Sequence, residues 1–282
     1  MAHPLSPVVR HLTVAQALYT GGAAVDLTLT AIVGTRLAPT MALATLPFTI
    51  IFVSAGASTF FISRAIGRVG HRAAFIGFSC FAALSGCASA VAIQFDLFWL
   101  FCVGTAMIGV YSAGAGYYRY LAAESMPRER ARAVTTVLAG GLVAALVGPF
   151  LATALSKVTP TPYVASYLLV AVLGTAAALW NRRLVVPAAA SHLTPDEDSA
   201  EVEPRRRGVL WRQPTLLLGV ACAVLAAGTM LAMMTAGPIM GMTVGHSADL
   251  SIASYVLRMG LRRGPGGPEA PSGWAGRKGS GG

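Results

Sequence analysis

The chain has 282 residues, of which 55% are hydrophobic and 11% are charged, against about 25% charged residues in soluble domains. This deficit of charge excludes an ordinary soluble domain and indicates a helical protein that crosses a membrane several times. The net charge of +10 does not indicate nucleic-acid binding, because arginines clustered between apolar runs are a topology signal in membrane proteins.

A basic stretch from Ser63 to Arg72 organises the rest of the chain. It holds three arginines and a histidine, and it lies between two uncharged runs of 27 residues (37–63) and 23 residues (73–95). About 20 apolar residues cross a bilayer as a helix, so each run predicts a membrane helix. The basic stretch therefore predicts a tight turn between them, on the cytoplasmic side because short arginine-bearing loops stay there.

The apolar runs together predict seven membrane helices. In chain order these cover 13–34, 41–62, 73–93, 97–121, 133–156, 163–181 and 214–240. The loops after the second, fourth and sixth helices hold three, three and six arginines, whereas the remaining loops hold Arg36, no basic residue, and Lys157. Because the basic loops alternate, we expect a multi-pass protein of the inner (plasma) membrane with a cytoplasmic N-terminus.

We therefore expect an all-α integral membrane protein with five segments. These are a cytoplasmic head (1–12), a six-helix transmembrane domain (13–181), a cytoplasmic linker (182–212), the start of a second transmembrane domain (213–260) and a Gly/Pro-rich tail (261–282). The linker and the tail are expected to be disordered because their composition cannot bury enough apolar surface. A partial eighth helix would begin near His246, so the architecture is expected to stop partway.

The basic stretch resembles a signature of the major facilitator superfamily, a family of secondary transporters. The signature is Gly-x-x-x-Asp-Arg-x-Gly-Arg-Arg, and Arg68, Gly70 and Arg72 match it. The chain departs from it at three positions, with Ser63 for the first glycine, Gly67 for the aspartate and His71 for the first arginine of the closing pair.

Further stretches support this resemblance. Gly148-Pro149 resembles a second signature in the fifth helix of the family. Residues 42–47, 118–124 and 139–141 resemble a bacterial branch that includes drug permeases and transporters similar to riboflavin permeases.

The resemblance implies transport by alternating access between two six-helix halves. Arg68, Gly70 and Arg72 would belong to the gating loop, with a latch weakened by the missing aspartate. The implied partners are membrane lipid and a small-molecule substrate, with or without protons, and no cofactor is implied. Because the family has twelve helices, the chain is expected to be a truncated copy that self-associates or pairs with a missing C-terminal half.

Two other classes of function are alternatives to a transporter. One is a non-transporting membrane fragment or scaffold that associates with a full-length homologue. The other is an integral-membrane enzyme, which would need a polar catalytic cluster or residues with metal-ligand spacing. The sequence contains no such constellation, and its four cysteines have no metal spacing, so an enzyme is not expected.

Asp26 is the sharpest candidate for a functional residue. It lies in the apolar body of the first predicted helix, eight residues or about 12 Å from the outer end. A carboxylate at that depth is costly unless it carries a proton or faces a cavity. Tyr19 and Thr30 lie on the same helical face as Asp26, which indicates that this face is turned inward. One interpretation is that Asp26 couples protons to transport or binds substrate. The alternative is that Asp26 is a protonated carboxyl that forms a hydrogen bond to a neighbouring helix.

Arg119, Tyr118 and Glu124 form a second candidate group near the cytoplasmic end of the fourth predicted helix. Arg119 can pair with Glu124 or a substrate anion, while neighbouring tyrosines supply ring faces. The alternative is that Arg119 snorkels to the headgroups and the tyrosines form an interfacial belt.

Small residues recur every four positions along the fifth predicted helix, at Gly140, Ala144, Gly148 and Ala152. This spacing favours close approach of two helix backbones. Pro149 removes one backbone hydrogen bond and is expected to bend the helix there.

Overall fold

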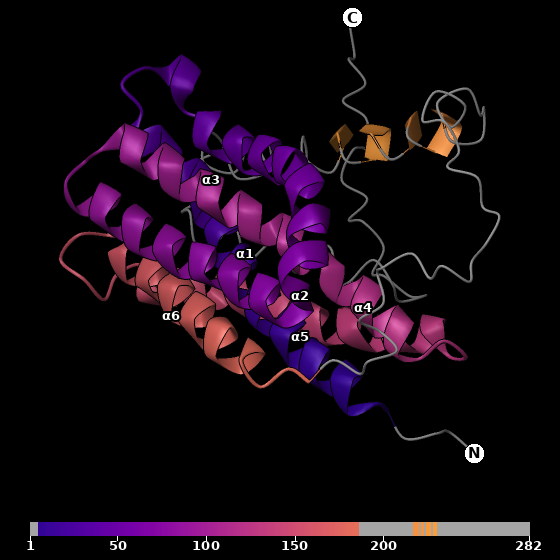
Figure 1. Cartoon of the computed structure of the whole chain (residues 1–282). Helices are drawn as coiled ribbons and strands as arrows, with labels where there is room; N and C mark the ends of the chain where they lie inside the picture. The colour runs from indigo at the N-terminus through magenta and orange to yellow at the C-terminus, as the bar shows by residue number, and fades with distance from the viewer. Residues whose placement is uncertain (1–4, 186–216, 220, 223, 227, 230–282) are drawn as a thin grey trace, which may run out of the picture. The chain divides into compact units, whose positions relative to one another are not determined.

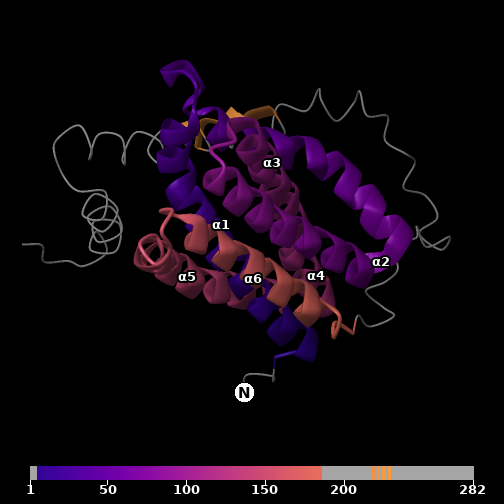
Figure 2. The same cartoon turned by 90° about the vertical axis from the view of Figure 1, so that its left-hand side faces the viewer.

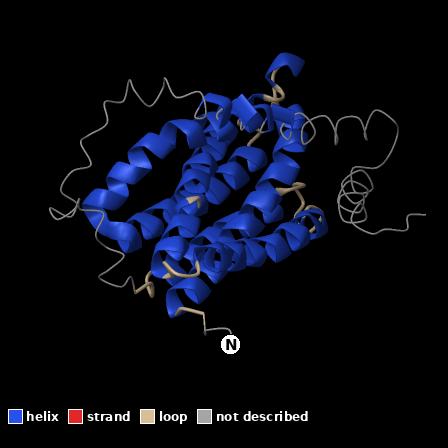
Figure 3. Ribbon diagram, turned by 90° about the vertical axis from the view of Figure 1, so that its right-hand side faces the viewer, coloured by secondary structure: helices blue, strands red, loops and turns tan. Residues whose placement is uncertain are grey.

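The computed structural model describes residues 5–185, 217–219, 221–222, 224–226 and 228–229. Within these ranges the regular structure is entirely helical, with no strand (Figure 3). Five helical segments there are long and apolar enough to cross a membrane. The elements, labelled in Figure 1, are α1 (Pro7–Leu37), η1 (Met41–Leu43), α2 (Leu46–Gln94), α3 (Phe98–Ala115), α4 (Tyr117–Ser125), α5 (Arg130–Leu155) and α6 (Val164–Asn181).

The chain turns within the expected stretch Ser63–Arg72, but the turn is a single residue with helix on both sides. Helix α2 runs for 49 residues, more than twice the length of one membrane crossing, and only Gly70 leaves helical geometry (φ 78°, ψ 161°). Figure 2 shows α2 turning back on itself at the right of the view. The turn is shorter than the ten predicted residues because nothing before Gly70 stops the helix, while glycine adopts positive φ without steric cost.

Two other helices extend beyond their predicted ends. Helix α1 begins at Pro7, inside the expected polar head, because proline suits the first turn of a helix. The fourth predicted helix appears as α3 and α4, which meet at Gly116, and it continues to Ser125 rather than stopping at Leu121. Glu124 therefore lies on a helix and not in a loop.

The described residues between Leu217 and Thr229 are helical, within the range expected for the seventh helix. The rest of that helix, the linker beyond Val185, the eighth helix and the Gly/Pro-rich tail lie outside the described residues.

Two glycines allow α2 and α6 to approach backbone to backbone. A Cβ on Gly86 of α2 would lie 2.7 Å from the Tyr167 carbonyl oxygen of α6, and a Cβ on Gly174 of α6 would lie 2.8 Å from the carbonyl carbon of Ala82. In a membrane, association of helices depends on such close packing because lipid gives no hydrophobic drive. The contact between α2 and α6 is therefore a main structural tie of the bundle.

Side-chain contacts join elements at two ends of the bundle. Arg36 in the last turn of α1 and Asp96 after α2 form an exposed ion pair of 3.6 Å at one end. At the other end, His11 stacks on Trp180 with ring centroids 5.0 Å apart, and Trp180 Nε1 donates to the His11 carbonyl oxygen. The start of α1 and the end of α6 thus meet at the end that carries Arg182 and Arg183.

Candidate functional site

A pocket of about 480 Å³ lies between α2 and the α3–α4 segment. This volume falls within the range of small-molecule sites, about 300–1,000 Å³. Helix α2 contributes Thr59 and His71 from opposite sides of the Gly70 break, and the α3–α4 segment contributes the remaining wall. The lining residues are Thr59, His71, Ser112, Ala113, Gly116, Tyr117, Arg119, Tyr120, Leu121 and Glu124.

The pocket holds one cation and one carboxylate that are not paired with each other. Arg119 and Glu124 both line it, both are exposed, and neither forms an ion pair or hydrogen bond within the described ranges. Their Cα atoms are separated by five residues, or about 7.5 Å of helix rise. The predicted pairing of Arg119 with Glu124 does not occur, so both charges remain free to contact a ligand.

The Arg119 side chain passes close to Gly116. A Cβ on Gly116 would lie 3.8 Å from Arg119 Nη2, which is an ordinary van der Waals contact. The rings of Tyr117 and Tyr120 pack edge to face, with centroids 5.6 Å apart and planes tilted by 61°. Both tyrosines line the same pocket as Arg119.

His71 closes the pocket on the α2 side. Its side chain is largely buried, with the ring against Phe75 in an edge-on arrangement at 6.0 Å. Glu124 is the acidic group that acts on His71 electrostatically. The chain departs from the family signature at this residue, and the structure places it in the pocket wall.

A hydrogen bond connects the pocket residue Ser112 to α1. Tyr19 is half-buried, and its hydroxyl lies 2.7 Å from the Ser112 hydroxyl oxygen. The Tyr19 ring also meets Tyr111 edge-on, with centroids 5.2 Å apart. Tyr19 therefore supports the pocket through Ser112 and does not itself line it.

Tyr118 points away from the pocket, into the core. It is 1% exposed, it packs edge-on against Phe75 at 4.7 Å, and its hydroxyl accepts a hydrogen bond from Asn181 Nδ2. Asn181 Nδ2 also donates to Ser79 Oγ at 3.1 Å. This cluster joins α2, α4 and α6, so Tyr118 holds α4 in place rather than supplying a ring face.

Asp26 lies in a separate buried polar group, outside the pocket. It is 1% exposed, and neither of its carboxyl oxygens has a hydrogen-bond partner among the described residues. One turn along α1, Thr30 Oγ1 lies 3.1 Å from the Tyr167 hydroxyl of α6, and Tyr167 is within electrostatic reach of Asp26. A carboxylate without a partner is costly in such a site, so the neutral, protonated form of Asp26 is favoured.

Two of the residues expected to form the gating loop are exposed at the α2 break. Arg68 precedes Gly70 on the first arm, and Arg72 follows it on the second arm. Neither arginine lines the pocket, although His71 between them does.

The small residues of α5 lie against α1. A Cβ on Gly140 would clash with Thr13, one on Gly148 would lie 2.6 Å from Ala24 Cβ, and Ala144 Cβ lies 3.7 Å from a Cβ placed on Gly21. Pro149 lies within α5, which continues through it to Leu155. These residues pack two helices closely and take no part in the pocket.

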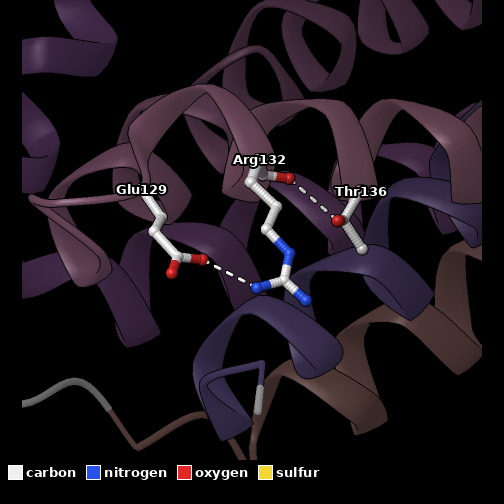
Figure 4. Close-up of polar contacts among 3 residues, drawn as sticks. All are labelled: Glu129, Arg132 and Thr136. Carbon is white, nitrogen blue, oxygen red and sulfur yellow. Dashed lines mark hydrogen bonds and ion pairs between the residues drawn. The ribbon is translucent and has the colours of Figure 1, made fainter. Parts of the chain in front are cut away.

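The first turn of α5 is anchored by an ion pair. Arg132 Nη1 lies 2.8 Å from Glu129 Oε2, and the Arg132 carbonyl accepts a hydrogen bond from Thr136 Oγ1 (Figure 4). This pair joins residues of the second basic loop to α5, away from the pocket.

Sequence reasoning did not single out four residues of these polar groups, Ser112, Tyr111, Tyr167 and Asn181. Each is a polar residue within an apolar span, which is the signal that could have found them. Their partners are between 63 and 137 positions distant in the chain, so only the fold identifies the contacts.

Within the described ranges, no cluster of His, Cys, Asp or Glu could hold a metal ion.

The all-helical bundle, with membrane-length spans and buried polar groups, has the character of a membrane transporter. The family model "Major Facilitator Superfamily" matches residues 12–261, and the chain belongs to this family. It is 32% identical over 253 residues to the riboflavin transporter RfnT of Brucella anthropi. That alignment covers 88% of the chain but only 63% of the relative, and no solved structure matches the chain significantly.

Proposed function

We propose that the chain takes part in proton-linked secondary transport of a small molecule across the plasma membrane by alternating access. The family membership supports a transport function. The observation that carries the proton link is Asp26, a fully buried carboxyl with two unpartnered oxygens within a membrane-length helix. Such residues in membrane spans mark ion or substrate pathways.

Asp26 is placed suitably for this role. It lies 11 residues from the end of α1 at Leu37, or about 16 Å, which is well within the span. Transporters hold their coupling ions near the bilayer midplane, between repeats that open to either side in turn. Thr30 and Tyr167 beside Asp26 supply hydroxyls that can stabilise either protonation state.

The first substrate to test is riboflavin, which the name of the Brucella relative supplies. Because the chain spans 63% of that relative, uptake is measured with the chain alone and with a chimera. The chimera continues the chain with the part of the relative that lies beyond the aligned region. Both proteins are placed in liposomes, and riboflavin uptake is followed with and without an inward proton gradient.

We expect acid-driven uptake by the chimera and its loss in Asp26→Asn, which keeps the shape and cannot titrate. Thr28→Ala is the matched control, because Thr28 bonds only the Ala24 carbonyl of its own helix. If riboflavin uptake by Asp26→Asn kept its dependence on the proton gradient, Asp26 would be a structural residue and the proposed proton link would be refuted.

A second proposal is that the chain acts as a non-transporting scaffold that associates with a full-length homologue. The observation that favours it is the outward apolar face of α5, which carries seven exposed large side chains, Leu138, Leu142, Val143, Leu146, Val147, Phe150 and Leu151. On this proposal the chain alone self-associates and gives no saturable uptake. Uptake by the purified monomer in liposomes would refute it.

A further inference from the structure

We infer that the pocket between α2 and α4 recognises the imide edge of a planar heteroaromatic ring, with Glu124 accepting from the imide N–H and Arg119 donating to an adjacent carbonyl. The inference rests on the proposed flavin substrate and assigns its binding mode. A flavin ring carries one N–H between two carbonyl groups, so its edge requires an acceptor beside a donor.

The charges of the pocket match this edge. Arg119 offers donors only and an ionised Glu124 offers acceptors only. Neither group forms an ion pair or a hydrogen bond within the described part of the chain, so both can turn to a ligand. Hydrogen bonds to charged groups are stronger than those between neutral groups, which gives this pair discriminating power.

The aromatic residues match the faces of the ring. Tyr117 and Tyr120 line the same pocket as Arg119, and their ring centroids lie 5.6 Å apart. An offset ring on a tyrosine face is favourable beyond the area it buries. A zwitterion without a ring would satisfy the two charges but would leave this aromatic surface unused.

The pocket is also long enough for a ring of this kind. Its lining along α3 and α4 runs from Ser112 to Glu124, which is about 18 Å of helix rise. The ring edge would lie between Arg119 and Glu124, and the remainder of the molecule would extend toward Ser112 and Tyr19. Asp26 does not line the pocket, so ligand recognition and proton binding use different residues.

The test compares two ligands that differ only at the imide nitrogen, riboflavin and N3-methylriboflavin. Binding to the full chain in nanodiscs is measured by quenching of flavin fluorescence. We expect riboflavin to bind about tenfold or more tightly than the methylated flavin, as a lost hydrogen bond to a charged group predicts. Equal affinity of the unsubstituted chain for the two flavins, or no binding of either, would overturn the inference.

Variants then assign the contact. In Glu124→Ala, riboflavin affinity should fall to that of the methylated flavin, so that the preference disappears, and Glu124→Gln should keep part of it. In Arg119→Ala, both ligands should weaken by similar factors. Arg128→Ala, an exposed arginine beyond the pocket, is the charge-matched control and should change neither affinity. A preference that survives in Glu124→Ala would refute the role of Glu124.

Binding and transport can fail separately. A chain that shows the ligand preference, while the chimera shows no acid-driven uptake, keeps the inference and refutes the proposed transport. Acid-driven riboflavin uptake together with equal binding of the two flavins refutes the inference alone.

Discussion

The Tyr19 hydroxyl on α1 lies 2.7 Å from the Ser112 hydroxyl on α3, and this bond joins the middle of the first helix to the wall of the pocket. The two residues are 93 positions apart in the chain. The contact therefore couples the helix that carries Asp26 to α3, which continues at Gly116 into α4 with Arg119 and Glu124.

Removing this bond should cost a measurable but modest amount of stability. Tyr19→Phe and Ser112→Ala each delete one partner, and the double variant should show a coupling of about 0.6 kcal/mol, with an upper limit of about 1.7. Unfolding in mixed micelles with increasing SDS measures it. Tyr120→Phe, which removes an exposed hydroxyl with no hydrogen-bond partner in the described structure, should unfold like the parent. Additive losses from the two substitutions would contradict the bond.

The close packing of α2 on α6 should make Gly86 intolerant of a side chain. A Cβ there would meet the Tyr167 carbonyl oxygen at 2.7 Å and backbone atoms of Ala171, which cannot move aside as a flexible side chain can. Gly86→Ala is expected to destabilise the bundle by about 1–3 kcal/mol.

Gly77→Ala is the matched control for this effect, since nothing lies within 4 Å of a Cβ at Gly77 on the same helix. It should be neutral, or stabilising by up to about 1 kcal/mol, because alanine favours helix. Equal unfolding curves for the two variants in SDS titrations would show that α2 and α6 lie farther apart.

Asn181 should contribute more to the stability of the bundle than its position at the end of α6 suggests. Asn181→Leu removes the donors to Ser79 and Tyr118 and leaves two buried hydroxyls with fewer partners, at an expected cost of about 1–3 kcal/mol. Thr175→Ala on the same helix deletes only a bond to the Ala171 carbonyl and should cost less. The two variants are compared by SDS unfolding. Equal losses of stability would show that the contacts of Asn181 with α2 and α4 add nothing to the stability of the bundle.

The expected orientation can be tested by labelling from each side of the membrane. Single cysteines at Arg68 and Lys157, in a background without Cys80, Cys87, Cys102 and Cys222, should react with an impermeant maleimide from opposite faces. The arginine-bearing turn should react only from the cytoplasm. Labelling of both positions from outside intact cells would contradict the assignment.

The membrane class, the helical fold and the burial of Asp26 could be predicted from the sequence. Apolar runs of about 20 residues have few alternatives to a membrane helix, and a lone acid within such a run is expected to lie inward. These predictions depend on local composition, which the sequence displays directly.

The faces of α4 could not be predicted in the same way. Tyr118 and Arg119 are neighbours, and the structure places one in the core and the other in the pocket. Lipid and the bundle interior are both apolar, so hydrophobicity hardly distinguishes the inner face of a membrane helix from the outer face. The partners of Tyr118 come from α2 and α6, and only the assembled bundle identifies them.

The break at Gly70 has a consequence for protein engineering. One non-helical residue joins the two arms of α2, so the turn has no slack to absorb a change of length. A single residue inserted next to Gly70, if it joins the second arm, would rotate that arm by about 100° and turn Phe75, Phe78 and Ala82 away from the core. The number of residues in this turn, more than its charge, keeps the two arms in register.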